Sequence, residues 1–204
     1  MKSKLIYVHD PMCSWCWGFE PIRKVLFEML PEEMEVKRLV GGLAPDSMEP
    51  MPQEMQNFLQ RTWSKIEQTI PGTKFNFDFW TLCQPRRSTY PSNRAVIAAR
   101  LQGEKFDKMM TLRIQKAYYQ EARNPSDNNT LIELAADIGL DVKRFEDDII
   151  TDKIEQLLLE EIQLTRSKGM NSFPSLAVES KQGLTPIHLN YTNVENMLQQ
   201  ILNI

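Results

Sequence analysis

Two cysteines separated by two residues stand where a short apolar run gives way to a predicted helix. The apolar run covers residues 5–8, and Cys13-Ser14-Trp15-Cys16 follows it after four residues. The N-terminus of a helix carries unpaired amide groups and a partial positive charge, which together stabilise a thiolate. Cys16 lies one helical turn after Cys13 and can reach its sulfur. The spacing therefore predicts a dithiol that reacts by thiol-disulfide exchange.

A structural zinc site and an inert pair of buried thiols are the two competing explanations of this motif. Tetrahedral zinc needs four ligands. Besides the pair, the sequence offers only Cys83, His9 and His188, and it contains no second paired motif. We therefore predict no bound metal. An inert pair, packed as small apolar side chains, is disfavoured because a polar turn between a strand and a helix usually lies at the surface.

Composition narrows the range of partners. The formal net charge is -3 and there is no block of Lys or Arg, so neither nucleic acid nor an anionic membrane is expected as a partner. The apolar run that precedes His9 is too short for a signal peptide or a membrane span. Three cysteines are too few for a secreted disulfide framework. We expect a cytoplasmic protein whose partners are protein, peptide or small-molecule thiols and disulfides, in an oligomeric state that the sequence leaves unspecified.

The hydrophobic pattern predicts an α/β start followed by a long helical part. Strand, helix and strand are predicted at 5–8, 14–30 and 34–40, before a proline-rich joint at 44–52. Helices are then predicted from Met55 to Ile70, at 92–102, at 104–119 and at 129–138, and a short helix is predicted after Asp141. A last helix of this part is predicted to begin at a capping box of Asp152 and Glu155 and to end at Gly169.

Strand periodicity returns near the end of the chain. Residues 175–178 and 184–188 flank a polar turn and predict a hairpin. Pro186 cannot donate a hydrogen bond to a neighbouring strand, so the second strand is expected at a sheet edge. Thr192 and Glu195 are predicted to cap a final helix.

Residues 75–87 carry aromatic rings and the third cysteine. Phe75, Phe77 and Phe79 alternate with polar residues, which predicts an extended segment whose three rings pack on one side. Cys83 is expected to be an unreactive thiol, because two nearby arginines indicate reactivity only weakly.

This order of elements resembles the DsbA-like thioredoxin-fold family, in which a helical insertion interrupts a thioredoxin fold. The matching segments are Cys13-Ser14-Trp15-Cys16-Trp17, Pro21 five residues after Cys16, residues 118–127 with 131–135, and residues 169–176. More narrowly, the chain is similar to the cytosolic FrnE-type branch, which contains predicted protein-disulfide isomerases and glutathione-using hydroxychromene-carboxylate isomerases. The resemblance implies thioredoxin-fold halves at 1–45 and 169–204 and an all-helical insertion domain at 46–168.

The resemblance also assigns roles to residues of the site. Pro174 matches the cis-proline that faces the two cysteines, and Phe173 would pair its backbone with a substrate; a trans proline that opens a strand is the alternative. Met12, Ser14 and Trp15 are predicted to surround Cys13 and contact the substrate. For Trp17, a place in the apolar rim around Cys13 and packing in the core are equally expected.

One element of the family pattern is missing from the sequence. A buried acid precedes the first cysteine by six residues in thioredoxin and DsbA, but Tyr7 occupies that position here. Proton transfer would then fall to His9, Asp10 or water. Alternatively, His9 has no role in proton transfer and is simply a residue at the end of the strand, with its ring hydrogen-bonded to a backbone group.

We therefore predict a thiol-disulfide oxidoreductase or disulfide isomerase, in which Cys13 attacks and Cys16 resolves. No cofactor is expected to be bound, and glutathione is the candidate redox partner. A glutathione-dependent isomerase or transferase on the same fold is one alternative; its relatives generally have Ser in place of Cys13. A non-enzymatic peptide-binding or chaperone-like module is the other.

Overall fold

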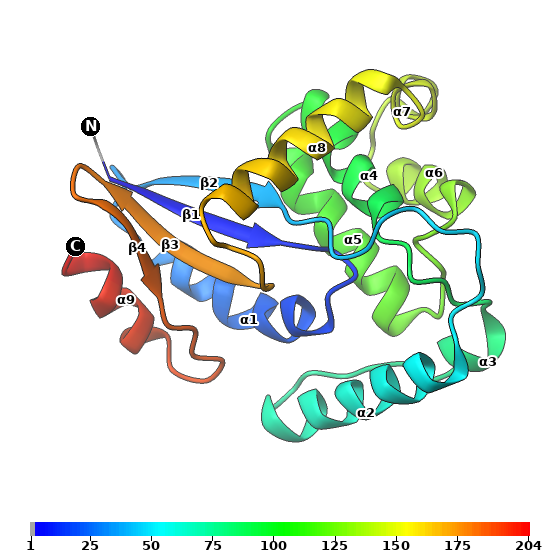
Figure 1. Cartoon of the computed structure of the whole chain (residues 1–204), viewed down its shortest axis with the longest axis horizontal. Coiled ribbons are helices and arrows are strands. Elements are labelled where there is room, and N and C mark those ends of the chain that lie inside the picture. The colour runs from blue at the N-terminus through cyan, green and yellow to red at the C-terminus, as the bar shows by residue number, and fades with distance from the viewer. Residues whose placement is uncertain (1–2) are drawn as a thin grey trace.

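The computed structural model describes residues 3–204, and a four-stranded sheet forms its centre (Figure 1). The strand order is β2-β1-β3-β4. β1 (Lys4–His9) is parallel to β2 (Glu35–Val40) and antiparallel to β3 (Ser175–Ser180), which pairs with β4 (Gly183–Ile187). The α/β class, with a thioredoxin fold interrupted by helices, is therefore confirmed.

β1 is central because its four inner side chains, Leu5 to Val8, are buried and alternate between two covered faces. Leu5 and Tyr7 pack with α1 (Ser14–Glu28) and α9 (Val194–Leu202), below the sheet in Figure 1. Ile6 and Val8 face the opposite side, where Leu164 of α8 packs. The strand thus delivers Cys13 to a fixed point at the end of the sheet.

Helices fill the described chain between β2 and β3. Their bounds are α2 (Gln53–Thr69), α3 (Phe79–Leu82), α4 (Tyr90–Leu101), α5 (Lys105–Gln120), α6 (Asn128–Asp137), α7 (Val142–Asp148) and α8 (Asp152–Ser167). α4 to α8 share one apolar core, which contains Ala98, Ile114, Leu134 and Leu158. α2 lies apart from that bundle, across the end of α1 (Figure 1). None of the helices within residues 3–204 combines the length and the apolar character that a membrane span requires.

Trp63 of α2 is the centre of an aromatic cluster that holds this helix to the rest of the molecule. Its ring lies 4.9 Å from that of Phe75, 5.7 Å from that of Phe77 and 6.1 Å from that of Phe79, measured between centroids. The predicted packing role of these rings is confirmed. The predicted extended conformation is wrong, because a turn at 77–78 leads into α3 and brings successive rings to the same partner.

Two predicted helix caps are displaced by one residue. Thr151, rather than Asp152, accepts the hydrogen bond from the backbone N–H of Ile154. In the last helix Asn193, rather than Thr192, is the cap. In both places two residues with good capping side chains are adjacent, so the sequence pattern alone does not choose between them. The hairpin and the edge position of Pro186 are confirmed.

Candidate redox site

Cys13 is the residue that caps the N-terminus of α1. Its backbone N–H bonds the carbonyl of Asp10 at 3.0 Å, and its carbonyl accepts from Trp17 at 3.1 Å. Cys13 therefore occupies the N-cap position, but its side chain accepts no hydrogen bond from the first N–H groups of the helix. Instead, the thiol donates to the carbonyl oxygen of Phe173 at 3.3 Å. The Phe173-Pro174 peptide bond is cis, as predicted.

Cys16 lies beneath Cys13 and has no exposed surface. Both thiols are free. Burial raises the pKa of the Cys16 thiol well above its usual value, and a hydrogen bond and the charge of Cys13 raise it further. Cys16 is consequently a protonated thiol at neutral pH.

The expectation that this turn lies at the surface is wrong. Met12, Cys13 and Ser14 are each only 7% exposed, because α2 and the Phe173 loop cover them. Cys13 nevertheless lines a pocket with a volume of about 290 Å³. Cys13 is thus reached through a pocket rather than from an open surface.

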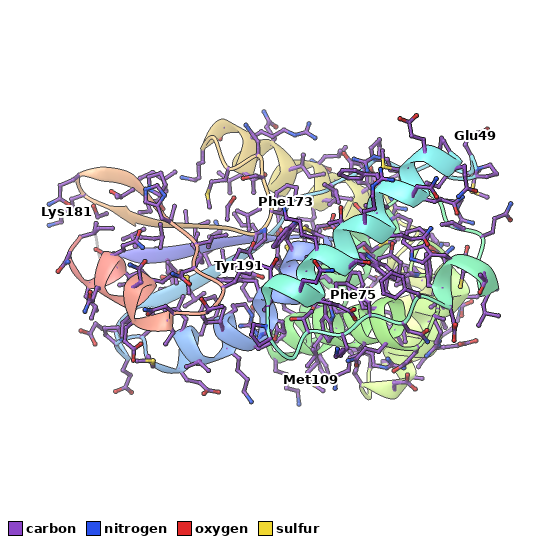
Figure 2. The ribbon with its side chains drawn as sticks, turned by 90° about the horizontal axis from the view of Figure 1, so that it is seen from below. Glu49, Phe75, Met109, Phe173, Lys181 and Tyr191 are labelled. Atoms are coloured by element: carbon purple, nitrogen blue, oxygen red, sulfur yellow. The ribbon has the colours of Figure 1, made fainter. Side chains whose placement is uncertain are left out.

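The walls of the pocket come from segments far apart in the sequence. They are Met12 to Trp15, Leu43, Ala44, Met51, the α2 residues Phe58, Leu59 and Thr62, then Arg86, Arg87, Thr89, Tyr118 and Phe173. In Figure 2, Glu49 and Lys181 lie at opposite ends of the molecule and Phe173 lies between them, beside α2. The α2 residues of this wall were not predicted from the sequence, although Phe58 lies on the apolar stripe of that helix and stays 53% exposed.

The residues between and after the cysteines are held by aromatic neighbours. Ser14 Oγ accepts a hydrogen bond from Trp63 Nε1 at 3.2 Å. Trp15 meets Tyr191 edge to face, with centroids 5.3 Å apart. Trp17 stacks on Tyr119 and does not line the pocket, so core packing is its role.

Asp10 is a buried carboxylate surrounded by donors. Oδ1 accepts from the N–H of Met12 at 2.8 Å, and Oδ2 accepts from Leu43 N–H, Thr89 Oγ1 and Asn93 Nδ2 at 2.7–2.8 Å. Burial raises the pKa of the Asp10 carboxyl, and these four bonds only partly offset the shift. Asp10 therefore ties the cysteine turn to the loop after β2 and to α4.

His9 belongs to a buried ionic network rather than to the pocket. Its Nε2 lies 3.1 Å from Arg38 Nη2, and Arg38 pairs with Asp107 of α5. Burial and the charge of Arg38 lower the pKa of His9 well below its usual value, so the ring is neutral. Tyr7 stacks on His9, with centroids 5.0 Å apart, and burial raises the pKa of its phenol. Neither residue lines the pocket beside Cys13.

The position of Phe173 in the site also depends on Gly41, which was not predicted from the sequence. A Cβ atom built at this position would lie 2.1 Å from Cε1 of Phe173. The glycine is needed for space, because the Phe173 ring packs directly over the backbone after β2.

Cys83 is separate from the pocket. Its thiol donates to the carbonyl of Ala122 at 3.0 Å, and burial raises its pKa, with a smaller contribution from Asp127. Within residues 3–204, no group of three or more His, Cys, Asp or Glu side chains is arranged to hold a metal ion.

A four-stranded sheet with a Cys-x-x-Cys helix opposite a cis-proline, and helices inserted between β2 and β3, defines a DsbA-like thioredoxin fold. The chain belongs to the thioredoxin family, because the family model described as Thioredoxin matches residues 6–198.

Solved structures agree with this assignment. A proposed protein disulfide isomerase from Nitrosomonas europaea superimposes with a TM-score of 0.85, at 29% identity, covering 100% of this chain and 97% of that one. The cytosolic disulfide reductase DsbM from Pseudomonas aeruginosa gives a TM-score of 0.75 at 23% identity, covering 98% and 94%, and has also been solved with GSH. The predicted resemblance to DsbA-like proteins is confirmed.

A curated relative carries a different kind of name. The ClpXP adapter protein SpxH of Halalkalibacterium halodurans is 26% identical over 204 residues, which cover 93% of this chain. The match spans 65% of the length of that relative.

Proposed function

We propose that the protein is a thiol-disulfide oxidoreductase in which Cys13 attacks and Cys16 resolves. The supporting observation is the position of Cys13: it is the N-cap residue of α1, it lines the pocket, and its thiol lies 3.3 Å from the carbonyl oxygen of Phe173. A cysteine that stands at the start of a helix and is reached through a pocket is placed to attack a substrate disulfide.

The reaction proceeds in two exchanges. The Cys13 thiolate attacks one sulfur of a substrate disulfide, forms a mixed disulfide and releases the first substrate thiolate. Cys16 then loses its proton and attacks the Cys13 sulfur, which releases the second thiolate and leaves a Cys13-Cys16 disulfide. Two electrons pass to the substrate; the reverse sequence oxidises a dithiol, and repeated exchange would isomerise disulfides.

Substrates would be thiols or disulfides of proteins, peptides or small molecules in the cytoplasm. Met12, Ser14, Trp15, Phe173 and Pro174 would form the part of the binding site next to the sulfur, and the 46–168 insertion would supply its outer wall. Glutathione is the proposed redox partner, a choice supported by the similar fold of DsbM, which has been solved with GSH.

A redox titration tests the proposal. The protein is equilibrated in glutathione buffers of graded potential, and its disulfides are mapped by mass spectrometry. We expect a reversible Cys13-Cys16 bond, loss of disulfide reduction in Cys13→Ser, and a trapped mixed disulfide in Cys16→Ser. Cys83→Ser is the matched control and should retain activity. If wild type and Cys13→Ser are equally inactive toward disulfides while a glutathione-dependent isomerisation proceeds, the isomerase alternative is correct.

A protein-binding role is a second candidate, favoured by the SpxH relatives and by an apolar surface beside the pocket. Leu43 and Phe58 both line the pocket and are 39% and 53% exposed, so a partner could cover apolar side chains there. Binding of the purified chain to purified ClpX, measured with wild type, Phe58→Asp and a Cys13→Ser, Cys16→Ser double variant, tests this role. Binding that is lost only in Phe58→Asp would support it, and absence of binding to ClpX would exclude the adapter role.

A further inference from the structure

The pocket beside Cys13 carries a charge opposite to that of the whole protein. Arg86 and Arg87 line it, whereas none of the described residues in its wall is Asp or Glu. The complete chain has a formal net charge of -3. An anionic molecule that enters this pocket therefore meets two guanidinium groups and no carboxylate among the residues of its wall.

The two arginines differ in exposure and in ion pairing. Arg86 is largely buried, donates to the carbonyl of Ser126 at 2.9 Å and forms an ion pair with Asp127. Arg87 is exposed and makes no ion pair with any residue from 3 to 204. Its hydrogen-bonding contact is between Nη1 and the sulfur of Met55, at 3.7 Å. Arg87 thus supplies an uncompensated positive charge at the edge of an apolar pocket.

We propose that Arg87 determines substrate specificity by binding a carboxylate carried next to the reacting half-cystine. This inference rests on the proposed oxidoreductase function and adds the chemical class of its substrate. A guanidinium can accept a carboxylate through two parallel hydrogen bonds. The apolar wall formed by Leu43, Phe58 and Leu59 would take the aliphatic part of the same substrate.

The size of the pocket limits what can enter it. A volume of about 290 Å³ corresponds to roughly ten water molecules. That space admits a half-cystine with its immediate neighbours but not a folded domain. The carboxylate could belong to a small thiol such as glutathione or to an acidic residue beside a cysteine in an unfolded segment.

Single-turnover reduction by the pre-reduced protein tests the inference without a recycling reductant. Each turnover consumes one substrate disulfide and yields two substrate thiols and the Cys13-Cys16 disulfide. The probes are symmetric disulfides of two blocked tripeptides, Ala-Cys-Glu and Ala-Cys-Gln, which differ only in charge. Glutathione disulfide serves as the small anionic probe, and hydroxyethyl disulfide as the neutral one.

We expect the wild type to reduce the Glu peptide about 3- to 10-fold faster than the Gln peptide, with a preference that falls as salt is added. In Arg87→Gln this ratio should approach 1, and Arg87→Lys should keep part of it. Arg61→Gln is the matched control, since Arg61 is an exposed arginine of α2 outside the Cys13 pocket. It should show the wild-type ratio.

The outcomes separate the inference from the function on which it rests. If hydroxyethyl disulfide and all the other probes remain unreduced, the oxidoreductase proposal fails. If the probes are reduced without a charge preference, or if the preference survives in Arg87→Gln, the role of Arg87 is wrong. An Arg87-dependent preference for the Glu peptide identifies protein segments as the source of the carboxylate. An Arg87-dependent preference that is seen only with glutathione disulfide identifies the small thiol as the source. Either result supports the inference.

Discussion

The Cys13 thiol donates a hydrogen bond to the carbonyl oxygen of Phe173 at 3.3 Å, although 160 positions separate the two residues. The contact follows from the sheet. β1 leads into Cys13, Phe173 and Pro174 lead into β3, and the antiparallel register places Val8 opposite Ser175. The end of one strand therefore lies beside the beginning of the other.

The difference between the two cysteines predicts selective alkylation. Burial and the neighbouring Cys13 raise the pKa of Cys16, and Cys16 has no exposed surface. With iodoacetamide at pH 7, we expect Cys13 to be modified at least about tenfold faster than Cys16, because only the thiolate reacts. Peptide mapping by mass spectrometry measures both rates. Faster modification of Cys16 would contradict the proposed order, in which Cys13 attacks and Cys16 resolves.

Replacing Asp10 should destabilise the protein. Asp10→Asn keeps the shape of the side chain but turns an NH₂ group toward donors that now bond a carboxylate. We expect a loss of about 2–4 kcal/mol in the free energy of unfolding, measured by urea denaturation. Asp46→Asn, which removes a half-exposed partner of Arg94, should cost less than about 1 kcal/mol.

His9 should make stability depend on mildly acidic pH. Its pKa is lowered in the folded state, so below about pH 6.5 the unfolded chain takes up a proton that the folded chain does not. Its contribution is complete above that pH and declines by up to about 1.4 kcal/mol per unit as the pH falls. Urea denaturation of wild type and His9→Asn between pH 8 and pH 5 should show a smaller decline in the variant. Equal slopes would show that folding does not lower the pKa of His9.

Enlarging Gly41 should disturb the site through Phe173. In Gly41→Ala the new methyl group would occupy the space of the Phe173 ring, so the ring and its carbonyl must move away from Cys13. We expect slower disulfide reduction together with a stability loss of about 1–3 kcal/mol. Gly139→Ala is the control, because its methyl group meets open space but its φ of 77° strains the backbone, so it should lower stability and leave the reduction rate unchanged. An unchanged reduction rate in Gly41→Ala would separate Phe173 from catalysis.

Local patterns predicted the regular elements well. The strand before Cys13, the helix that begins at Ser14 and the hairpin carrying Pro186 could all be derived from apolar spacing, turn residues and the chemistry of proline. The same local patterns gave the wrong helix cap where two neighbouring residues both have good capping side chains, as at Thr151 and Asp152.

The surroundings of the dithiol could not be derived in this way. The position of Asp10 in the sequence says nothing of Thr89 or Asn93, which supply two of its four donors. Likewise, the apolar stripe of α2 predicts a buried face, but not that Phe58 would border the pocket of Cys13.

The sequence by itself determined the order of the elements and the placement of Cys13 at the start of a helix, because these depend on residues a few positions apart. Only the tertiary structure decided that Cys13 is nearly buried, that Asp10 is enclosed by donors, and that Arg87 lines the pocket without an ion-pair partner among residues 3–204. Burial and local charge are sums over whatever packing brings near, and here α2 and the segment from Arg86 to Thr89 lie far from the cysteines along the chain.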